Sequence, residues 1–190
     1  FLTEHWANPS STHAMARKPA SALEDARTQV AEWAGTRPRD VIFTSGATEA
    51  NHLALQGTVQ REGKCGLAVS AIEHPSILSP GERLGAVVLP VDNNGRVSLE
   101  ALESALANGV GLVSIMAANN ETGVIQDLAS VYKLTDAAGA LLHVDAAQAA
   151  ARITLPQDWD LLTLSGHKAG GLKGAGALLR REGVKVVAQQ

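Results

Sequence analysis

Residues 97–117, VSLEALESALANGVGLVSIMA, join a helix pattern directly to a strand pattern. Ser98 is a favourable helix N-cap, three leucines then recur at helical spacing, and Gly109 is typical of the residue that follows a helix end. The next run, GLVSIMA at 111–117, is almost wholly apolar, which favours a strand covered on both faces. We therefore predict a helix at 98–108 that leads into a buried strand.

The same alternation extends along the whole chain. Alternating strands and helices predict a three-layer α/β/α fold with a mostly parallel, roughly seven-stranded sheet, and we expect one domain over residues 1–190. Further strands are predicted at 40–45, 66–70, 86–90, 141–145, 160–165 and 176–181, and further helices at 17–34, 48–60, 76–84 and 127–138.

Composition excludes several classes of protein. Apolar residues make up 45% and charged residues 18% of the 190 residues, as in ordinary globular proteins. The net charge is −3 without a basic cluster, so we expect neither a nucleic-acid partner nor a membrane partner. A single cysteine cannot form an internal disulfide, and no secretory leader is recognisable, so we expect a cytoplasmic protein. We predict no metal site.

Polar, reactive side chains follow five of the predicted strands. Because the carboxyl ends of parallel strands meet at one edge of a sheet, where ligands of such folds bind, we expect these side chains to lie together. The segments are TSGATEAN (44–51), IEHPS (72–76), ANNETG (118–123), VDAAQ (144–148) and SGHK (165–168).

Asp145 and Lys168 carry the charges that a cofactor could use. Asp145 ends an apolar strand, where it would either cap a helix starting at Ala146 or pair with a cation brought by a ligand. Lys168 would either be a solvated loop lysine or form a Schiff base with an aldehyde. An acid for a pyridine nitrogen together with a lysine for an aldehyde is the minimal equipment for pyridoxal 5′-phosphate (PLP).

A phosphate site is also available in the sequence. In SGATEAN, Gly46 permits close backbone approach and Thr48 offers a hydroxyl, while the helix that begins there presents free N–H groups. Ser165 and His167 could donate to the same phosphate. The plain alternative is a strand-to-helix turn capped by a hydroxyl.

Three further polar residues suit the ring of such a cofactor. His74 either caps the turn before Pro75 or stacks on the ring and moves protons. Asn120 and Gln148 either are structural amides or contact the ring and its hydroxyl.

The order of these motifs resembles the NifS/IscS-type cysteine desulfurases, in the class V aminotransferase group of fold-type-I PLP enzymes. The resemblance covers essentially the whole chain and rests on NPSSTH, SGATEAN, EHP, ANNETG, HVDAAQ and SGHK.

The resemblance implies a role at each matching position. Lys168 would attach PLP and act in catalysis, Asp145 would pair with the pyridine nitrogen, and His74 would stack on the ring and act in catalysis. The remaining cofactor contacts would be Asn120 and Gln148 at the ring and its hydroxyl, and Ala47, Thr48, Ser165 and His167 at the phosphate.

The family converts L-cysteine to L-alanine and passes the sulfur to an enzyme cysteine, for iron–sulfur cluster or thio-cofactor synthesis. The resemblance therefore implies a homodimer, L-cysteine as substrate and a sulfur-acceptor protein as partner. Alternatives are another class V enzyme, such as a selenocysteine lyase or an aminotransferase, and a shortened non-catalytic binding or dimerisation module.

Some family features have no counterpart in this sequence. The opening strand is missing ahead of Phe1, and the small domain with its substrate-binding arginine, phosphate-binding threonine and persulfide cysteine does not follow. Cys65 precedes a strand at the opposite edge from the predicted site, which favours a packing role. We therefore expect residues 1–190 alone to be inactive.

Overall fold

The computed structural model describes residues 4–59 and 66–187, and contacts divide the chain into two compact units. The first unit, residues 1–41, contains helix α1 (Arg17–Ala34) between two short 3₁₀ turns, η1 (Ala14–Ala16) and η2 (Pro38–Asp40). Helix α1 ends at Gly35, whose φ of 69° lies in the left-handed region that glycine adopts without strain. Cys65, which we predict to be a packing residue, lies outside the described residues.

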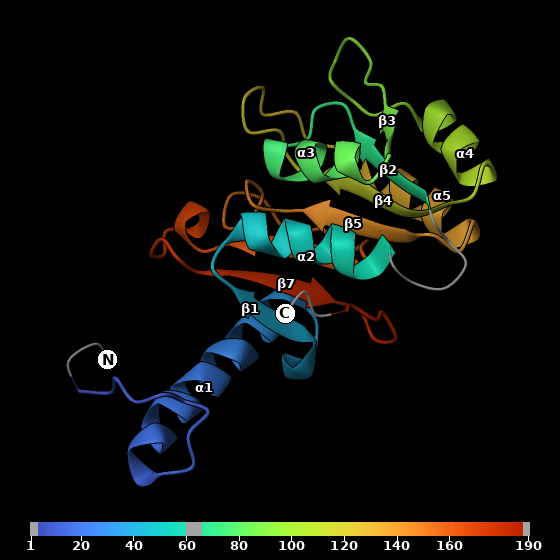
Figure 1. Ribbon diagram of the computed structural model, residues 1–190. Coiled ribbons are helices and arrows are strands. Elements are labelled where there is room, and N and C mark those ends of the chain that lie inside the picture. The colour runs from blue at the N-terminus through green and yellow to red at the C-terminus, as the bar shows by residue number, and fades with distance from the viewer. Residues whose placement is uncertain (1–3, 60–65, 188–190) are drawn as a thin grey trace. The chain divides into compact units, whose positions relative to one another are not determined.

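A seven-stranded sheet organises the second unit, residues 42–190 (Figure 1). The strands lie in the order β1-β7-β6-β5-β4-β2-β3, and the pairs β2–β3, β2–β4, β4–β5 and β5–β6 are parallel. Only the β6–β7 pair is antiparallel among the pairings described. The strands are β1 (Val41–Thr44), β2 (Gly66–Ser70), β3 (Val87–Leu89), β4 (Val110–Met116), β5 (Leu141–Asp145), β6 (Leu161–Ser165) and β7 (Gly176–Arg180).

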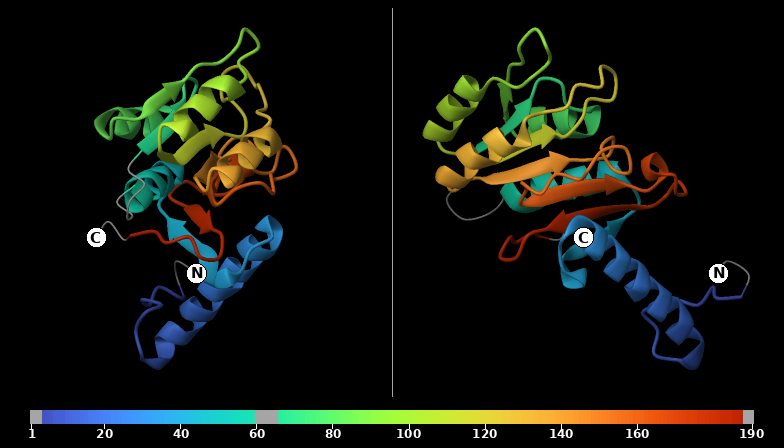
Figure 2. Two further views of the ribbon diagram at one scale, coloured as in Figure 1. Left: turned by 90° about the vertical axis from the view of Figure 1, so that its right-hand side faces the viewer. Right: turned by 180° about the vertical axis from the view of Figure 1, so that it is seen from behind.

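Helices cover both faces of this sheet. Figures 1 and 2 show α2 (Ala47–Val59) and α3 (Pro75–Arg83) over one face, and α4 (Leu99–Ala107) and α5 (Leu128–Ala137) over the other. The predicted α/β/α layering and mostly parallel sheet are therefore confirmed, and the predicted strands and helices lie within about two residues of the observed ones. Ser98 caps α4 as predicted, accepting the N–H of Ala101 at 3.2 Å.

The main core lies between α2 and the sheet. Leu55 of α2 is fully buried against apolar side chains of β2, β4, β6 and β7, among them Leu112 and Leu178. Burying one such leucine stabilises the fold by about 1.5–3 kcal/mol. Because α2 is anchored along its length, its first turn is held rigidly at the edge where the parallel strands end.

A buried histidine ties the three central strands together below that edge. His143 of β5 is fully buried, with Nδ1 2.8 Å from Ser114 Oγ of β4 and Nε2 3.0 Å from Thr163 Oγ1 of β6. Burial lowers the pKa of His143 to about 3, so the ring stays neutral and serves as a hydrogen-bonded cross-link. Asp145 follows two residues later at the end of β5 and therefore starts from a fixed strand.

Candidate active site

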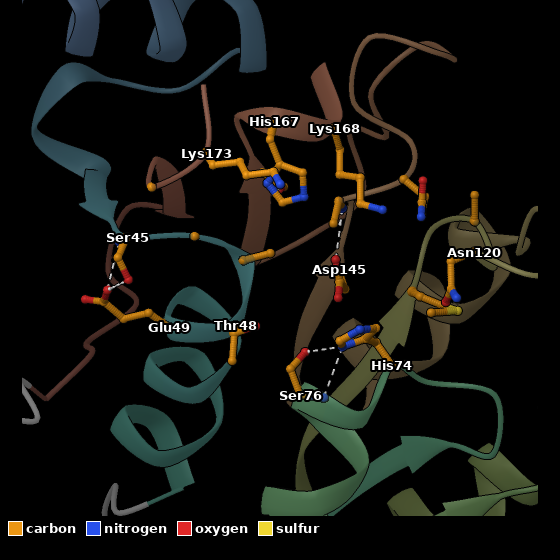
Figure 3. Close-up of a pocket in the computed structure, with 18 residues that line it drawn as sticks. Ser45, Thr48, Glu49, His74, Ser76, Asn120, Asp145, His167, Lys168 and Lys173 are labelled. Carbon is orange, nitrogen blue, oxygen red and sulfur yellow. Dashed lines mark hydrogen bonds between the residues drawn. The ribbon is translucent and has the colours of Figure 1, made fainter. Parts of the chain in front are cut away.

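A pocket of about 540 Å³ opens at the edge where the parallel strands end (Figure 3). This volume lies in the ordinary range for small-molecule sites. All nine site residues predicted from the sequence line the pocket, so the structure brings them together, and their individual roles stay predictions. They are Ala47, Thr48, His74, Asn120, Asp145, Gln148, Ser165, His167 and Lys168.

Asp145 supplies a buried carboxyl group to the pocket. Its side chain is 5% exposed, its Oδ1 accepts the N–H of Ala147 at 2.9 Å, and its Oδ2 accepts from Asn51 Nδ2 at 2.8 Å. Burial raises the pKa of Asp145, while these two hydrogen bonds and the nearby His74 act in the opposite direction. The helix considered at Ala146 is wrong, because residues 147–152 form turns. Asp145 therefore does not cap a helix.

His74 is both a helix cap and a pocket residue. It is the N-cap of α3, and its Nδ1 accepts the backbone N–H of Ser76 at 3.1 Å. The structural alternative considered for His74 is thus realised, yet the ring also lines the pocket. Because Nδ1 is engaged as an acceptor, the neutral ring carries its hydrogen on Nε2, which can donate to a ligand.

The opposite side of the pocket is suited to an anion. Helix α2 begins at Ala47, and the first N–H groups of a helix have no partner within it. A Cβ atom at Gly46 would meet nothing within 4 Å, so the backbone there is open to a bound group. Ser165 Oγ and His167 Nδ1 lie 3.3 Å apart on the same side. This combination can bind a phosphate.

Glycine at position 176 allows two backbone segments to approach each other at the anion-binding side of the pocket. A Cβ atom at Gly176 would come within 2.6 Å of the Cα and carbonyl carbon of Gly46. The start of β7 and the turn before α2 can therefore approach only if no side chain lies between them. Because β7 runs antiparallel to β6, its first residue pairs with Ser165 at the pocket edge.

Two lysines reach the pocket. Lys168 belongs to the short 3₁₀ turn η3 (His167–Ala169), and no carboxylate of the described residues lies within ion-pair distance of it. Lys173 is exposed but also lines the pocket, and Figure 3 shows it on the same side as His167.

The two asparagines of ANNETG have different roles. Asn119 Oδ1 accepts the N–H groups of Glu121 and Thr122, both at 2.9 Å, and its Nδ2 donates to Ile72 O at 3.0 Å. This side chain therefore shapes the loop and ties it to the end of β2. Asn120 is left to face the pocket.

Sequence reasoning missed several polar residues around the site. Glu49 also lines the pocket, accepts the N–H of Ser45 at 2.8 Å and takes a second hydrogen bond from the Ser45 hydroxyl, which together lower the pKa of Glu49. Glu73 is buried, with Oε1 accepting from Ser70 Oγ and, at 2.8 Å, from the Met116 N–H. Glu49 belongs to the motif SGATEAN, and Glu73 directly precedes His74 in IEHPS. Their places in these motifs were the only sequence signal for them.

None of the helices in residues 4–59 and 66–187 combines the length and apolar character needed to cross a membrane.

Comparisons with known proteins place the chain in a family. A model of the family "Aminotransferase class-V" matches residues 1–190. A cysteine desulfurase from Cereibacter sphaeroides is 40% identical over 195 residues, which cover 97% of this chain and 50% of that protein. One from Homo sapiens is 39% identical over 203 residues, which cover 100% of this chain and 44% of that protein. The chain thus spans about half the length of these relatives.

Solved structures agree with these relatives. A NifS-like protein superposes with a TM-score of 0.94 at 34% identity, covering 100% of this chain and 56% of that one. SspA in complex with cysteine gives a TM-score of 0.90 at 31% identity, covering 99% of this chain and 58% of that one. The matched family model, with the same fold in these structures, shows that the chain belongs to the class-V aminotransferase family.

Proposed function

We propose that this chain forms the PLP-binding part of a cysteine desulfurase, which converts L-cysteine to L-alanine and transfers the sulfur to an enzyme cysteine. The observation that carries the proposal is one pocket in which a buried Asp145 carboxyl, the Lys168 amine and the first turn of α2 meet. The names of the relatives support the reaction, and the relative solved in complex with cysteine supports the substrate.

The residues of the pocket fit PLP in its three chemical parts. The ring nitrogen needs an anion, which Asp145 supplies from a buried, hydrogen-bonded position. The aldehyde needs an amine, which Lys168 supplies. The phosphate needs N–H and O–H donors, which the α2 start, Ser165 and His167 supply next to the open backbone of Gly46.

PLP supplies an electron sink when bound, and the chain supplies the charges and protons around it. Asp145 holds a negative charge at a fixed position, which keeps the ring nitrogen protonated. His74 presents Nε2–H toward the ligand and can exchange that proton with a reacting group. Asn120 and Gln148 offer amide donors to the ring oxygen, and Gln148 Oε1 is oriented by Arg152 Nη1 at 3.3 Å.

The remaining features of the proposed enzyme rest on the resemblance. We propose a PLP-binding large domain over residues 1–190, a homodimer, a cytoplasmic location and a sulfur-acceptor protein for iron–sulfur cluster synthesis. The persulfide cysteine and the substrate-carboxylate arginine have no counterpart in this sequence, and Cys65 is not proposed as the nucleophile.

Attachment of PLP to Lys168 is the direct test. The purified protein is incubated with PLP, reduced with borohydride and mapped by mass spectrometry, with Lys168→Arg and Lys173→Arg as matched variants. We expect label on Lys168 in the wild type and in Lys173→Arg, and none at that peptide in Lys168→Arg. Label concentrated on Lys173 would contradict the assignment.

The reaction class needs a second assay. A desulfurase forms alanine from L-cysteine without any keto-acid acceptor, whereas an aminotransferase requires one. In the intact enzyme that contains this chain, alanine formation in the absence of a keto acid, lost in Lys168→Arg, is the expected result. Turnover that appears only when a keto acid is added would place the protein with the aminotransferases.

A further inference from the structure

Asn51 joins two residues of the site from the interior of α2. Its side chain is fully buried, and its Nδ2 lies 2.8 Å from Asp145 Oδ2 and 2.9 Å from Ser76 Oγ. These partners are 94 and 25 residues away along the chain. The amide therefore links the start of α2, the end of β5 and the start of α3 at one point behind the pocket.

Hydrogen-bond chemistry fixes the direction of these contacts. A carboxylate oxygen can only accept, so the amide must turn its NH₂ group toward Asp145; the reverse orientation would oppose two oxygens at 2.8 Å. The second hydrogen of the same NH₂ group is then donated to Ser76 Oγ. Ser76 Oγ in turn lies 2.8 Å from His74 Nδ1 and can donate its own hydrogen there. Donation thus runs from Asn51 through Ser76 to His74.

We propose that Asn51 is a positioning residue that keeps Asp145 charged and correctly oriented for the ring nitrogen of PLP, an inference that rests on the proposed function. Asn51 is the side-chain donor to Asp145 in the described part of the structure, and the other donor is the backbone N–H of Ala147. The link to Ser76 keeps the amide from rotating away. The Asn51 amide therefore orients the Asp145 carboxylate and is itself held by Ser76 at the start of α3.

The charge balance around Asp145 supports this role. Burial favours the neutral acid and raises the pKa of Asp145, whereas the Ala147 N–H, the Asn51 amide and His74 favour the charged form. Glu73, near the end of β2, is affected in turn, because the charge of Asp145 raises the pKa of Glu73. The other titratable groups that line the pocket are Glu49, His167, Lys168 and Lys173. Without Asn51, one of the two hydrogen bonds that offset burial would be lost.

The first experiment measures Asp145 itself, in protein without PLP. Aspartate labelled with ¹³C at the carboxyl carbon is titrated by NMR, and the Asp145 signal is assigned with Asp145→Asn. In Asn51→Leu, which keeps the volume and removes the donors, we expect the midpoint of Asp145 to rise by about one to two pH units, the scale of one hydrogen bond to a charged group.

Two further variants distinguish the loss of this hydrogen bond from a general loss of packing. Thr58→Val changes a buried polar residue two turns further along α2 and should leave the Asp145 midpoint where it is in the wild type. Asn51→Asp keeps the shape but places a second carboxyl beside Asp145, so the midpoint should again rise, because two adjacent acids cannot both ionise easily. This variant decides the question if Asn51→Leu does not fold.

PLP affinity is measured on the same variants by absorbance titration. We expect Asn51→Leu to bind PLP about tenfold more weakly or worse, and Thr58→Val to bind it like the wild type. An unchanged Asp145 midpoint in both Asn51 variants, or equal PLP affinities of Asn51→Leu and Thr58→Val, would overturn the proposal. Failure of the wild type to bind PLP would instead refute the proposed function, and the NMR titration would still decide what Asn51 does to Asp145.

Discussion

Glu73 offers a sharp test of the electrostatics behind the site. Its carboxyl group is buried at the end of β2, and its Oε1 accepts from Ser70 Oγ and the Met116 N–H. Its Oε2 has no hydrogen-bond partner among the described residues. Burial, and to a smaller extent the charge of Asp145, raises the pKa of Glu73 from 4.5 to about 8. The folded protein thus holds a proton that the unfolded chain releases.

The sign and size of the effect follow from this difference. Between the unfolded value of 4.5 and the folded value of about 8, the folded state binds more protons at Glu73. The stability that Glu73 contributes is therefore fully present below the unfolded pKa and is lost as pH rises through that window. Linkage gives a loss of about 4 kcal/mol between about pH 5 and about pH 9. Glu73→Gln preserves the shape of the protonated acid and cannot titrate.

The assay compares urea unfolding of Glu73→Gln and the wild type across that range. We expect the variant to gain stability relative to the wild type as pH rises, by several kcal/mol in total. Taking the difference between the two proteins cancels other titrating groups, including His143, whose lowered pKa makes stability fall toward acid pH. Glu82→Gln, at an exposed position of α3, is the surface control. A difference between Glu73→Gln and wild type that stays constant with pH would refute the buried-proton argument.

Three further substitutions test the site. Asp145→Asn keeps the shape and removes the charge, so PLP should bind more weakly and, in the intact enzyme, alanine formation should fall at least ~10²-fold; wild-type turnover would leave Asp145 a structural role only. His74→Ala should lose about 1 kcal/mol of unfolding free energy because it removes the N-cap of α3, whereas His74→Asn should keep that cap. Both variants should slow the spectral change of PLP-loaded protein on adding L-cysteine, and unchanged rates would show that His74 only caps α3. Gly176→Ala should cost about 1–3 kcal/mol in denaturant unfolding and weaken PLP binding, because its Cβ would displace the Gly46 backbone; an unaltered PLP affinity would show that this approach does not shape the anion side.

The sequence by itself was enough to predict the layers and the edge that carries the site. Its apolar runs are short, continuous and separated by helical patterns, and such runs are stable only as strands covered on both faces. Polar residues placed directly after these runs had to meet at one edge, because parallel strands end there together. Asp145 and Lys168 were found in this way, since Asp145 ends β5 and Lys168 lies three residues after the end of β6, so that neither position requires knowledge of distant contacts.

The tertiary structure alone decided how those residues are supported. Asn51 and Ser76 are ordinary in sequence, and their connection to Asp145 exists only because α2, α3 and β5 pack side by side. Residues 147–152 form turns in place of the helix considered there, and the Asp145 carboxyl group is engaged by Asn51 as well as by the Ala147 N–H. The buried proton of Glu73 depends on desolvation by neighbouring strands, which no local pattern specifies. The pattern of strands and helices follows from the local sequence, whereas side-chain hydrogen-bond partners and burial arise only when distant segments are brought together.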